Sequence, residues 1–189
     1  MSEPRILVFA GSLRTGAFSA QLAGAALKEL VRLDVEASMI SLADYTMPLF
    51  DADHEAKIGV PAAARKLYDM MLAHRGIYIA TPEYNASLPP LLKNTIDWVS
   101  RIRDTKSPFK HVVFALGSTS NRQGGGHLAL MALRQVLELG LGALVIPEQV
   151  SVPEAAHAFD DAGDLTEEAL AKMLRNSVQR LVTLTNADL

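Results

Sequence analysis

The chain alternates between short apolar runs and longer stretches with apolar residues at helical spacing. Apolar runs bounded by polar or turn residues predict strands, and they cover residues 5–10, 34–42, 76–81, 111–116 and 142–147. Helical periodicity predicts helices over residues 18–33, 62–73, 88–103, from about 126 to 139, and from about 165 to the C-terminal region. This alternation predicts an α/β fold with a parallel sheet and helices on both faces.

The segments between these elements carry fewer signals. Residues 47–61 predict a loop, and Asp164 and Glu167 have the capping-box spacing that starts a helix. The last helix then buries Leu170, Leu174 and Val178 on one face. Because no repeat, low-complexity tract or linker interrupts the pattern, we expect residues 1–189 to form a single domain.

Composition narrows the chemistry. The 189 residues are 49% hydrophobic and 21% charged, with a formal charge of -3 and no basic block, so we expect neither nucleic acid nor a membrane as a partner. There is no cysteine, which excludes disulfides and thiol catalysis, so any redox role needs a bound cofactor. The apolar run Ile6–Ala10 is too short for a signal peptide, and we therefore expect a cytoplasmic protein.

The loop after the first strand, residues 11–19, predicts a phosphate site. A helix N-terminus offers free backbone N–H groups to an anion, and Ser12, Arg14 and Ser19 can add side-chain donors. A P-loop is excluded because Ala17-Phe18 stands where Lys-Ser/Thr is required. A G-x-G-x-x-G dinucleotide loop is excluded because Leu13 occupies the second glycine position. A mononucleotide phosphate fits this loop better than ATP does.

Polar groups also gather after the third strand. Pro82, Glu83, Tyr84 and Asn85 lie at its carboxyl end, where open α/β sheets bind ligands. Glu83 could act as a general base, but a paired or solvated carboxylate is the favoured interpretation, and Tyr84 could either stack on a ligand or pack the loop. The five histidines lack metal-ligand spacing, so we predict no metal.

Three loops together resemble the NADPH-dependent FMN reductase family, which includes quinone, azo-dye and chromate reductases. Residues 11–19 are similar to its phosphate loop G-S-L-R-x-x-S-x-N, and residues 118–134 to its loop S-A-S-P-G-x-x-G-G-x-R…L-R. Residues 82–98 match the signature P-E-Y-N-x-S-x-P-x-x-L-K-N-x-I-D-W almost without gaps. The resemblance implies a flavodoxin-like three-layer sandwich with strand order 2-1-3-4-5.

The resemblance also implies a noncovalently bound FMN (flavin mononucleotide) that carries the chemistry, with no catalytic side chain. The cofactor-binding residues that it implies are Ser12, Arg14, Ser19, Pro82, Glu83, Tyr84, Asn85, Ser118 and Gly125. NADPH or NADH is the implied co-substrate, and a quinone or another small molecule is the implied electron acceptor. A flavin reductase that releases FMN as a substrate remains an alternative, as does a non-catalytic flavin-binding electron carrier or regulator.

Some positions differ from the family pattern. Ala17 and Ser19 replace a serine and an asparagine, which predicts weaker FMN binding, and Asn121-Arg122 replaces Pro-Gly, which predicts a less ordered third loop. Apolar side chains of helix 88–103 span an arc of roughly 160°, wider than one core contact needs. We expect the apolar side chains beyond those that face the core, together with Leu128, to form a homodimer or homotetramer contact that completes each flavin site.

Overall fold

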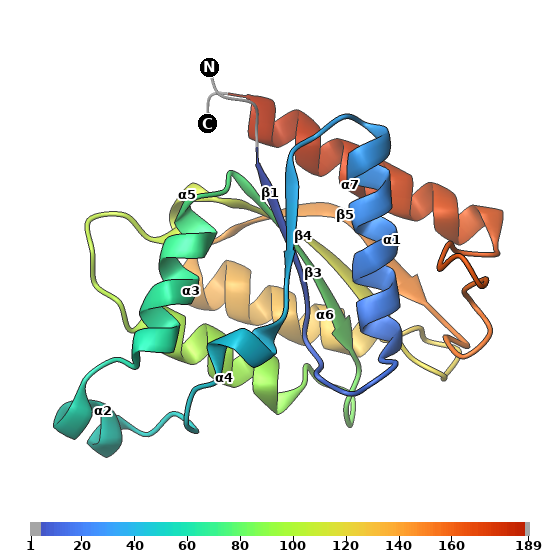
Figure 1. The fold of residues 1–189 in the computed structure, drawn as a ribbon. Helices are drawn as coiled ribbons and strands as arrows, with labels where there is room; N and C mark the ends of the chain where they lie inside the picture. The colour runs from blue at the N-terminus through green and yellow to red at the C-terminus, as the bar shows by residue number, and fades with distance from the viewer. Residues whose placement is uncertain (1–4, 188–189) are drawn as a thin grey trace.

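Five parallel strands form the centre of the molecule, and helices cover both faces of the sheet (Figure 1). The computed structural model describes residues 5–187. The strand order is β2-β1-β3-β4-β5, which confirms the predicted flavodoxin-like topology. The strands are β1 (Ile6–Ala10), β2 (Ala37–Ile40), β3 (Gly76–Pro82), β4 (Val113–Thr119) and β5 (Leu144–Val152).

The helices connect the strands by crossovers. The α-helices are α1 (Phe18–Arg32), α2 (Ala52–Ile58), α3 (Ala62–Leu72), α4 (Pro90–Ser100), α5 (Pro108–His111), α6 (His127–Arg134) and α7 (Glu168–Asn186). A 3-10 turn, Leu42–Tyr45, follows β2, and a π-helical segment, Gln135–Gly140, continues α6. Within residues 5–187, no helix has both the length and the apolar character needed to cross a bilayer.

The sheet divides the core in two. Ile6 and Val8 of β1 pack with α1 and α7, whereas Leu7 and Phe9 pack with α3, α4 and α6. All four side chains are fully or almost fully buried because helices cover both faces. This explains why the strands read as continuous apolar runs rather than as alternating patterns.

The register of the strands brings the loops together. Ala10, the last residue of β1, pairs with Ala80 of β3, and Pro82, the last residue of β3, pairs with Thr119 at the end of β4. The chain leaves all of these strands at the same edge of the sheet, so the segments after β1, β3 and β4 become neighbours. We call them the first loop (11–17), the second loop (83–89) and the third loop (120–126).

Several predicted boundaries were wrong. Strand β2 is shorter than predicted, and the expected loop 47–61 contains α2, whose N-cap Asp51 accepts the His54 N–H at 2.9 Å. Strands β4 and β5 run on past Leu116 and Pro147, with an irregular register between them. Helix α2 projects from the body of the molecule (Figure 1), and all of its residues are at least partly exposed.

The predicted capping box does not form. Helix α7 begins at Glu168, its N-cap Glu167 makes no side-chain cap bond, and Asp164 lies outside the helix. The Asp164 carboxylate instead pairs with Lys28 and Arg32 of α1, at 3.3 and 3.5 Å. Pairing across the structure therefore overrides the local capping signal.

The wide apolar arc of α4 is covered within the chain. Leu92 and Ile96 are buried on the sheet side, and Trp98 is fully buried, with its ring 5.0 Å from that of Phe50. The Trp98 indole N–H donates to the Pro48 carbonyl at 2.7 Å. The segment before α2 thus packs against Trp98 of α4, and the arc needs no second subunit to cover it.

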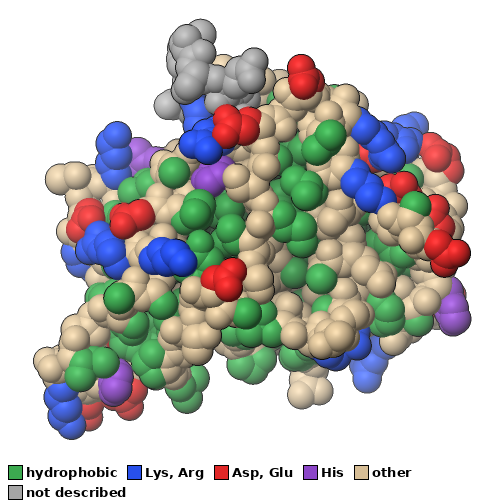
Figure 2. Space-filling view, in the orientation of Figure 1, with side chains coloured by type: hydrophobic (Ala, Val, Ile, Leu, Met, Phe, Trp, Pro, Cys, Tyr) green, Lys and Arg blue, Asp and Glu red, His purple; other side chains and the backbone are tan. Residues whose placement is uncertain are grey.

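Charge is dispersed on the face shown in Figure 2. Lysine and arginine side chains there lie among aspartate and glutamate side chains rather than in one basic patch. This arrangement agrees with the small formal charge of -3.

Candidate functional site

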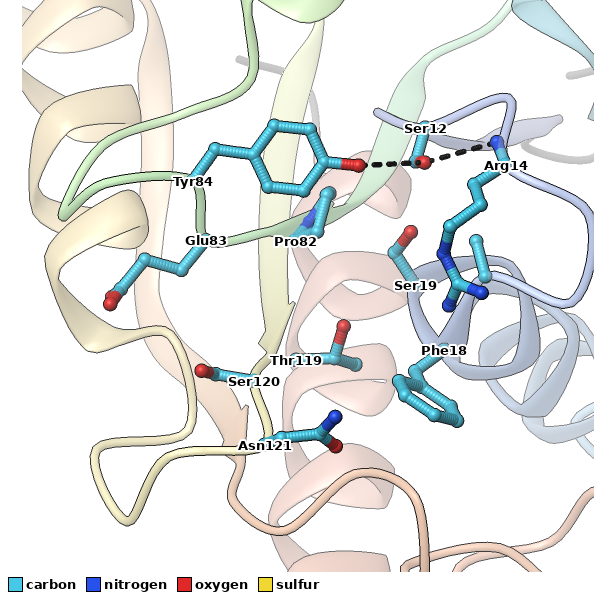
Figure 3. Close-up of a pocket in the computed structure, with 11 residues that line it drawn as sticks. Ser12, Arg14, Phe18, Ser19, Pro82, Glu83, Tyr84, Thr119, Ser120 and Asn121 are labelled. Atoms are coloured by element: carbon cyan, nitrogen blue, oxygen red, sulfur yellow. Dashed lines mark hydrogen bonds between the residues drawn. The ribbon is translucent and has the colours of Figure 1, made fainter.

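A cavity of about 370 Å³ lies where the three loops meet (Figure 3). The first loop and the start of α1, the second loop, and the end of β4 with the third loop each contribute part of its wall. The lining residues are Ser12, Arg14, Ala17, Phe18, Ser19, Pro82, Glu83, Tyr84, Thr119, Ser120 and Asn121. Of the nine predicted cofactor-binding residues, six line this cavity, and Asn85, Ser118 and Gly125 do not.

The start of α1 supplies unpaired donors to the cavity. Ser19 is fully buried, and its hydroxyl has no hydrogen-bond partner within residues 5–187. The N-cap residue, Ala17, is in an extended conformation and makes no side-chain cap bond. The first backbone N–H groups of the helix therefore face the cavity without a cap, which suits a bound anion.

Arg14 lies beside this helix end. Its guanidinium donates to the carbonyls of Thr15 and Gly16 at 3.3 and 3.2 Å, and it sits 5.4 Å from the centre of the Phe18 ring. These contacts hold a permanent positive charge next to the unpaired donors of α1. Arg14 and Ser19 both line the cavity.

The second loop is tied to its neighbours through Glu83. The Glu83 N–H donates to the Thr119 carbonyl at 3.3 Å, and the Glu83 carboxylate accepts the Leu128 N–H at 3.1 Å. In Figure 3 this side chain points away from the cavity. The carboxylate serves the N-terminus of α6, which agrees with the paired interpretation and not with a general base.

Tyr84 to Ser87 form a tight turn at the tip of the second loop. Tyr84 and Ser87 exchange backbone hydrogen bonds of 3.0 and 3.1 Å, and Asn85 and Ala86 both have positive φ, 49° and 61°. Asparagine tolerates this region well, so Asn85 has a structural role in the turn. The turn presents the Tyr84 ring over the cavity, while Asn85 itself is exposed.

Ser118 and Gly125 support the third loop from behind. The buried Ser118 hydroxyl donates to the Gly125 carbonyl at 2.8 Å. Gly125 has φ of 60°, and a Cβ there would lie 2.8 Å from the Ser151 backbone, so no other residue fits without a shift. Both residues shape the loop rather than line the cavity.

Hydrogen bonds tie the third loop to the end of β5 and the segment after it. Ser120 donates from its N–H to Val152 at 3.1 Å and accepts from Ala155 at 3.2 Å. The Asn121 side chain accepts the Ala156 N–H at 3.0 Å. Asn121 therefore anchors the loop to the segment after β5, although the Pro-Gly pair of the family pattern is missing.

Phe18, Thr119, Ser120 and Asn121 line the cavity but were not predicted. Strand periodicity could have identified Thr119, because side chains alternate between the two faces of a strand. Ser118 points toward α6, so Thr119 must point toward α1 and the cavity. Asn121 could not be predicted, since its position depends on the distant segment around Ala156.

Titratable side chains show no metal site. Within residues 5–187, no three His, Asp or Glu side chains cluster closely enough to hold a metal ion. The lining side chains of the cavity are instead mostly hydroxyl, amide and aromatic groups.

Comparison with known proteins agrees with this geometry. The sequence profile of the NADPH-dependent FMN reductase family matches residues 4–157. The chain belongs to this family. An NAD(P)H-dependent FMN reductase of Pseudomonas aeruginosa is 34% identical over 179 residues, which cover 94% of this chain and 92% of that protein. A quinone reductase of Escherichia coli is 37% identical over 139 residues, 72% of this chain and 71% of that protein.

A solved structure supports the family fold. FerB, a flavoenzyme NAD(P)H:(acceptor) oxidoreductase from Paracoccus denitrificans, aligns with a TM-score of 0.78 and 26% identity. The alignment covers 96% of this chain and 97% of FerB. The resemblance of the three loops to an FMN reductase is therefore confirmed at the level of the family, over most of the chain.

The residues present fit an FMN. The buried, unpaired Ser19 hydroxyl, the uncapped start of α1 and the Arg14 guanidinium form a donor set for a phosphate. The second and third loops form two walls beside it, where a planar ring system can lie.

Proposed function

We propose that this protein is an FMN-dependent NAD(P)H oxidoreductase that reduces quinones or other small acceptors. The observation that carries the proposal is the buried Ser19 hydroxyl, unpaired and directed into a cavity built by the family's three loops. When bound, FMN supplies hydride acceptance from the nicotinamide and electron delivery to the acceptor. The side chains of the cavity bind the FMN and fix its position.

We assign the residues as follows. Ser12, Arg14 and Ser19 hold the phosphate, and Pro82 to Tyr84 border the ring, with Asn85 forming the turn that carries Tyr84. Ser118 and Gly125 keep the third loop in place. Because the Glu83 carboxylate is engaged by the Leu128 N–H, no side chain is positioned here as a general base, and backbone N–H groups orient the ring.

The first test is a titration of the apoprotein with FMN, followed by quenching of flavin fluorescence. Saturation at or below micromolar FMN, with steady oxidation of NADH or NADPH when a quinone is added, is the expected result. Failure to bind FMN at tens of micromolar would refute the proposal. Binding without NAD(P)H oxidation would identify an electron carrier or regulator instead.

Release of the flavin after its reduction, as in a flavin reductase that uses FMN as a leaving substrate, is the second candidate function. Two features favour it: Ala17 offers no side-chain donor, and Arg14 is already bonded to its own loop carbonyls. Gel filtration of the FMN-loaded protein distinguishes the two functions. Flavin that elutes with the protein supports a fixed cofactor, and flavin that separates from it supports a leaving substrate.

We also propose that the protein assembles as a homodimer or homotetramer through α6 and the π-helical segment. Leu128, Met131 and Leu139 are 48%, 55% and 84% exposed there, beside an apolar groove lined by Leu88 and Val136. This surface lies next to the second loop, so a partner could complete the flavin site. Sedimentation should show a dimer or tetramer at micromolar concentration, and Leu139→Asp should shift it toward the monomer.

Two further proposals concern the domain organisation and the cellular location. We propose that residues 1–189 act as one domain, since residues 5–187 share one sheet and two helical layers. A cytoplasmic location fits a cysteine-free chain that consumes NAD(P)H. Fractionation of the source cells tests the location, and limited proteolysis that yields no stable fragment tests the single domain.

A further inference from the structure

The orientation of the Asn121 amide is fixed by its neighbour. A backbone N–H can only donate, so the atom 3.0 Å from the Ala156 nitrogen must be the Asn121 oxygen. The Asn121 NH2 group is then left on the other side, and Figure 3 shows it directed toward Phe18 and Thr119 in the cavity. Within residues 5–187, no acceptor bonds to this NH2 group. Asn121 is therefore a hydrogen-bond donor held toward the cavity.

Two hydroxyl groups point into the same space. The Ser19 hydroxyl is fully buried and unpaired, and the Thr119 hydroxyl, on the neighbouring strand end, is directed upward from β4 in Figure 3. The Phe18 ring closes the opposite side, with the Arg14 guanidinium 5.4 Å from its centre. The space thus has donors on two walls and a positive charge beside it, with no carboxylate among these residues.

This donor set suits an anion. The first loop offers few side-chain donors, because Ala17 has none and the Arg14 guanidinium is partly used by Thr15 and Gly16. The donors of Thr119 and Asn121 come from the other side of the cavity, so together with Ser19 they can surround a tetrahedral group.

We infer that Asn121, supported by Thr119, is a phosphate-binding residue of this protein. The inference rests on the proposed function and adds to it that the flavin phosphate is held between the start of α1 and the third loop. The third loop then contributes directly to the choice of FMN over riboflavin, the same molecule without the phosphate.

Asn121→Asp separates this role from the structural one. Aspartate keeps an oxygen for the Ala156 N–H, so the loop remains tied, but the group facing the cavity becomes a carboxylate oxygen that repels phosphate. Gln123→Glu, on the exposed part of the same loop, makes the same change in charge without facing the cavity and is the matched control.

The measurement is fluorescence-quenching titration of each variant with FMN and with riboflavin, and it requires no turnover. We expect Asn121→Asp to weaken FMN binding by at least about tenfold and riboflavin binding by less than about twofold. Gln123→Glu should leave both within about twofold of wild type. Thr119→Val, nearly identical in shape, should weaken FMN alone by about threefold or more. Circular dichroism checks that each variant folds.

Two results would overturn the inference while the proposed function stands. If wild type and Asn121→Asp bind FMN equally, Asn121 only ties the loop. If Asn121→Asp weakens FMN and riboflavin equally, Asn121 acts on the ring or on the loop and not on the phosphate. If Asn121→Asp does not fold, Thr119→Val decides alone, and an FMN affinity equal to wild type overturns the inference. Wild-type protein that binds neither flavin overturns the proposed function as well.

Discussion

The Tyr84 hydroxyl lies 3.3 Å from the Ser12 hydroxyl, and this contact joins the second loop to the first across the cavity. Ser12 also accepts the Arg14 N–H at 3.2 Å, so one serine links the turn that carries Tyr84 to the backbone beside the predicted phosphate site (Figure 3). Either hydroxyl can be the donor in this contact. When Ser12 donates to Tyr84, its single proton is not available to a phosphate, and in that arrangement the contact competes with ligand binding.

We expect Tyr84→Phe to raise FMN affinity by about two- to tenfold, which corresponds to the loss of one exposed hydrogen bond. The ring stays in place, and the Ser12 hydroxyl becomes free to donate to the ligand. Equilibrium titration with FMN measures the effect. A lower affinity would instead mean that the Tyr84 hydroxyl contacts the ligand directly.

Arg14→Ala should weaken FMN binding by at least about tenfold, because a charge-assisted contact to the phosphate is lost. Stability should change little, since the guanidinium is exposed and bonds only to its own loop. Titration with FMN, with urea unfolding as the stability control, tests this. An unchanged dissociation constant would remove Arg14 from the phosphate site.

Ser19→Ala should have opposite effects on stability and on binding. Its hydroxyl is buried and unpaired without a ligand, so its removal should leave the apoprotein equally stable or more stable, by up to about 1–2 kcal/mol. FMN affinity should fall by about tenfold, because a buried donor to the phosphate is lost. Urea unfolding of the apoprotein and FMN titration measure the two effects. A large loss of apoprotein stability would show that the hydroxyl has a structural partner instead.

Tyr78→Phe should stabilise the protein by about 1 kcal/mol at neutral pH, because the fully buried Tyr78 hydroxyl also lacks a partner. Burial raises the pKa of Tyr78 above its ordinary value of 10.0. Below pH 10 the tyrosine is neutral in both the folded and the unfolded chain, so its ionisation does not change the free energy of unfolding. Above it the unfolded chain loses a proton that the folded chain keeps, so wild-type stability should fall by about 1.4 kcal/mol per pH unit.

Urea unfolding at pH 8 and pH 11 tests the Tyr78 prediction. The advantage of Tyr78→Phe over wild type should be larger at the higher pH. Some alkaline loss should remain in the variant, because burial also raises the pKa of Tyr45 and Tyr68. An equal advantage at both values would contradict the assignment to Tyr78 ionisation.

Asn94→Ala should destabilise the protein by about 1–3 kcal/mol. The Asn94 side chain accepts the Phe50 N–H at 2.7 Å and donates to the Pro48 carbonyl at 2.9 Å, so it fixes the segment before α2 against α4. Lys93→Ala is the matched control: it removes only an exposed pair with Asp97 and should cost less than about 0.5 kcal/mol. Thermal unfolding of both variants measures the difference, and equal midpoints would contradict this role for Asn94.

Local patterns determined much of the fold. The buried strands β1 and β3 read as apolar runs because helices cover both of their faces, and α1 was predicted nearly to its ends because its buried residues repeat at helical spacing. The three-loop motif led to the family, which the profile match and the relatives confirm. Parallel strands then require the loops after β1 and β3 to meet at one edge of the sheet, so the meeting of Ser12 with Tyr84 follows from topology.

Contacts between residues distant in sequence decided the features that local patterns did not predict. Asp164 has the spacing of a helix cap, but its carboxylate forms ion pairs with Lys28 and Arg32, which lie more than a hundred residues earlier in the chain. The predicted 160° arc of α4 needed no partner subunit because Pro48 and Phe50 cover Trp98. The sequence showed only that Asn121 departs from the family pattern, whereas the structure shows its side-chain oxygen accepting the Ala156 N–H. In each case a hydrogen bond or contact between residues distant in sequence outweighs a local preference, and only the folded chain shows which distant residue supplies it.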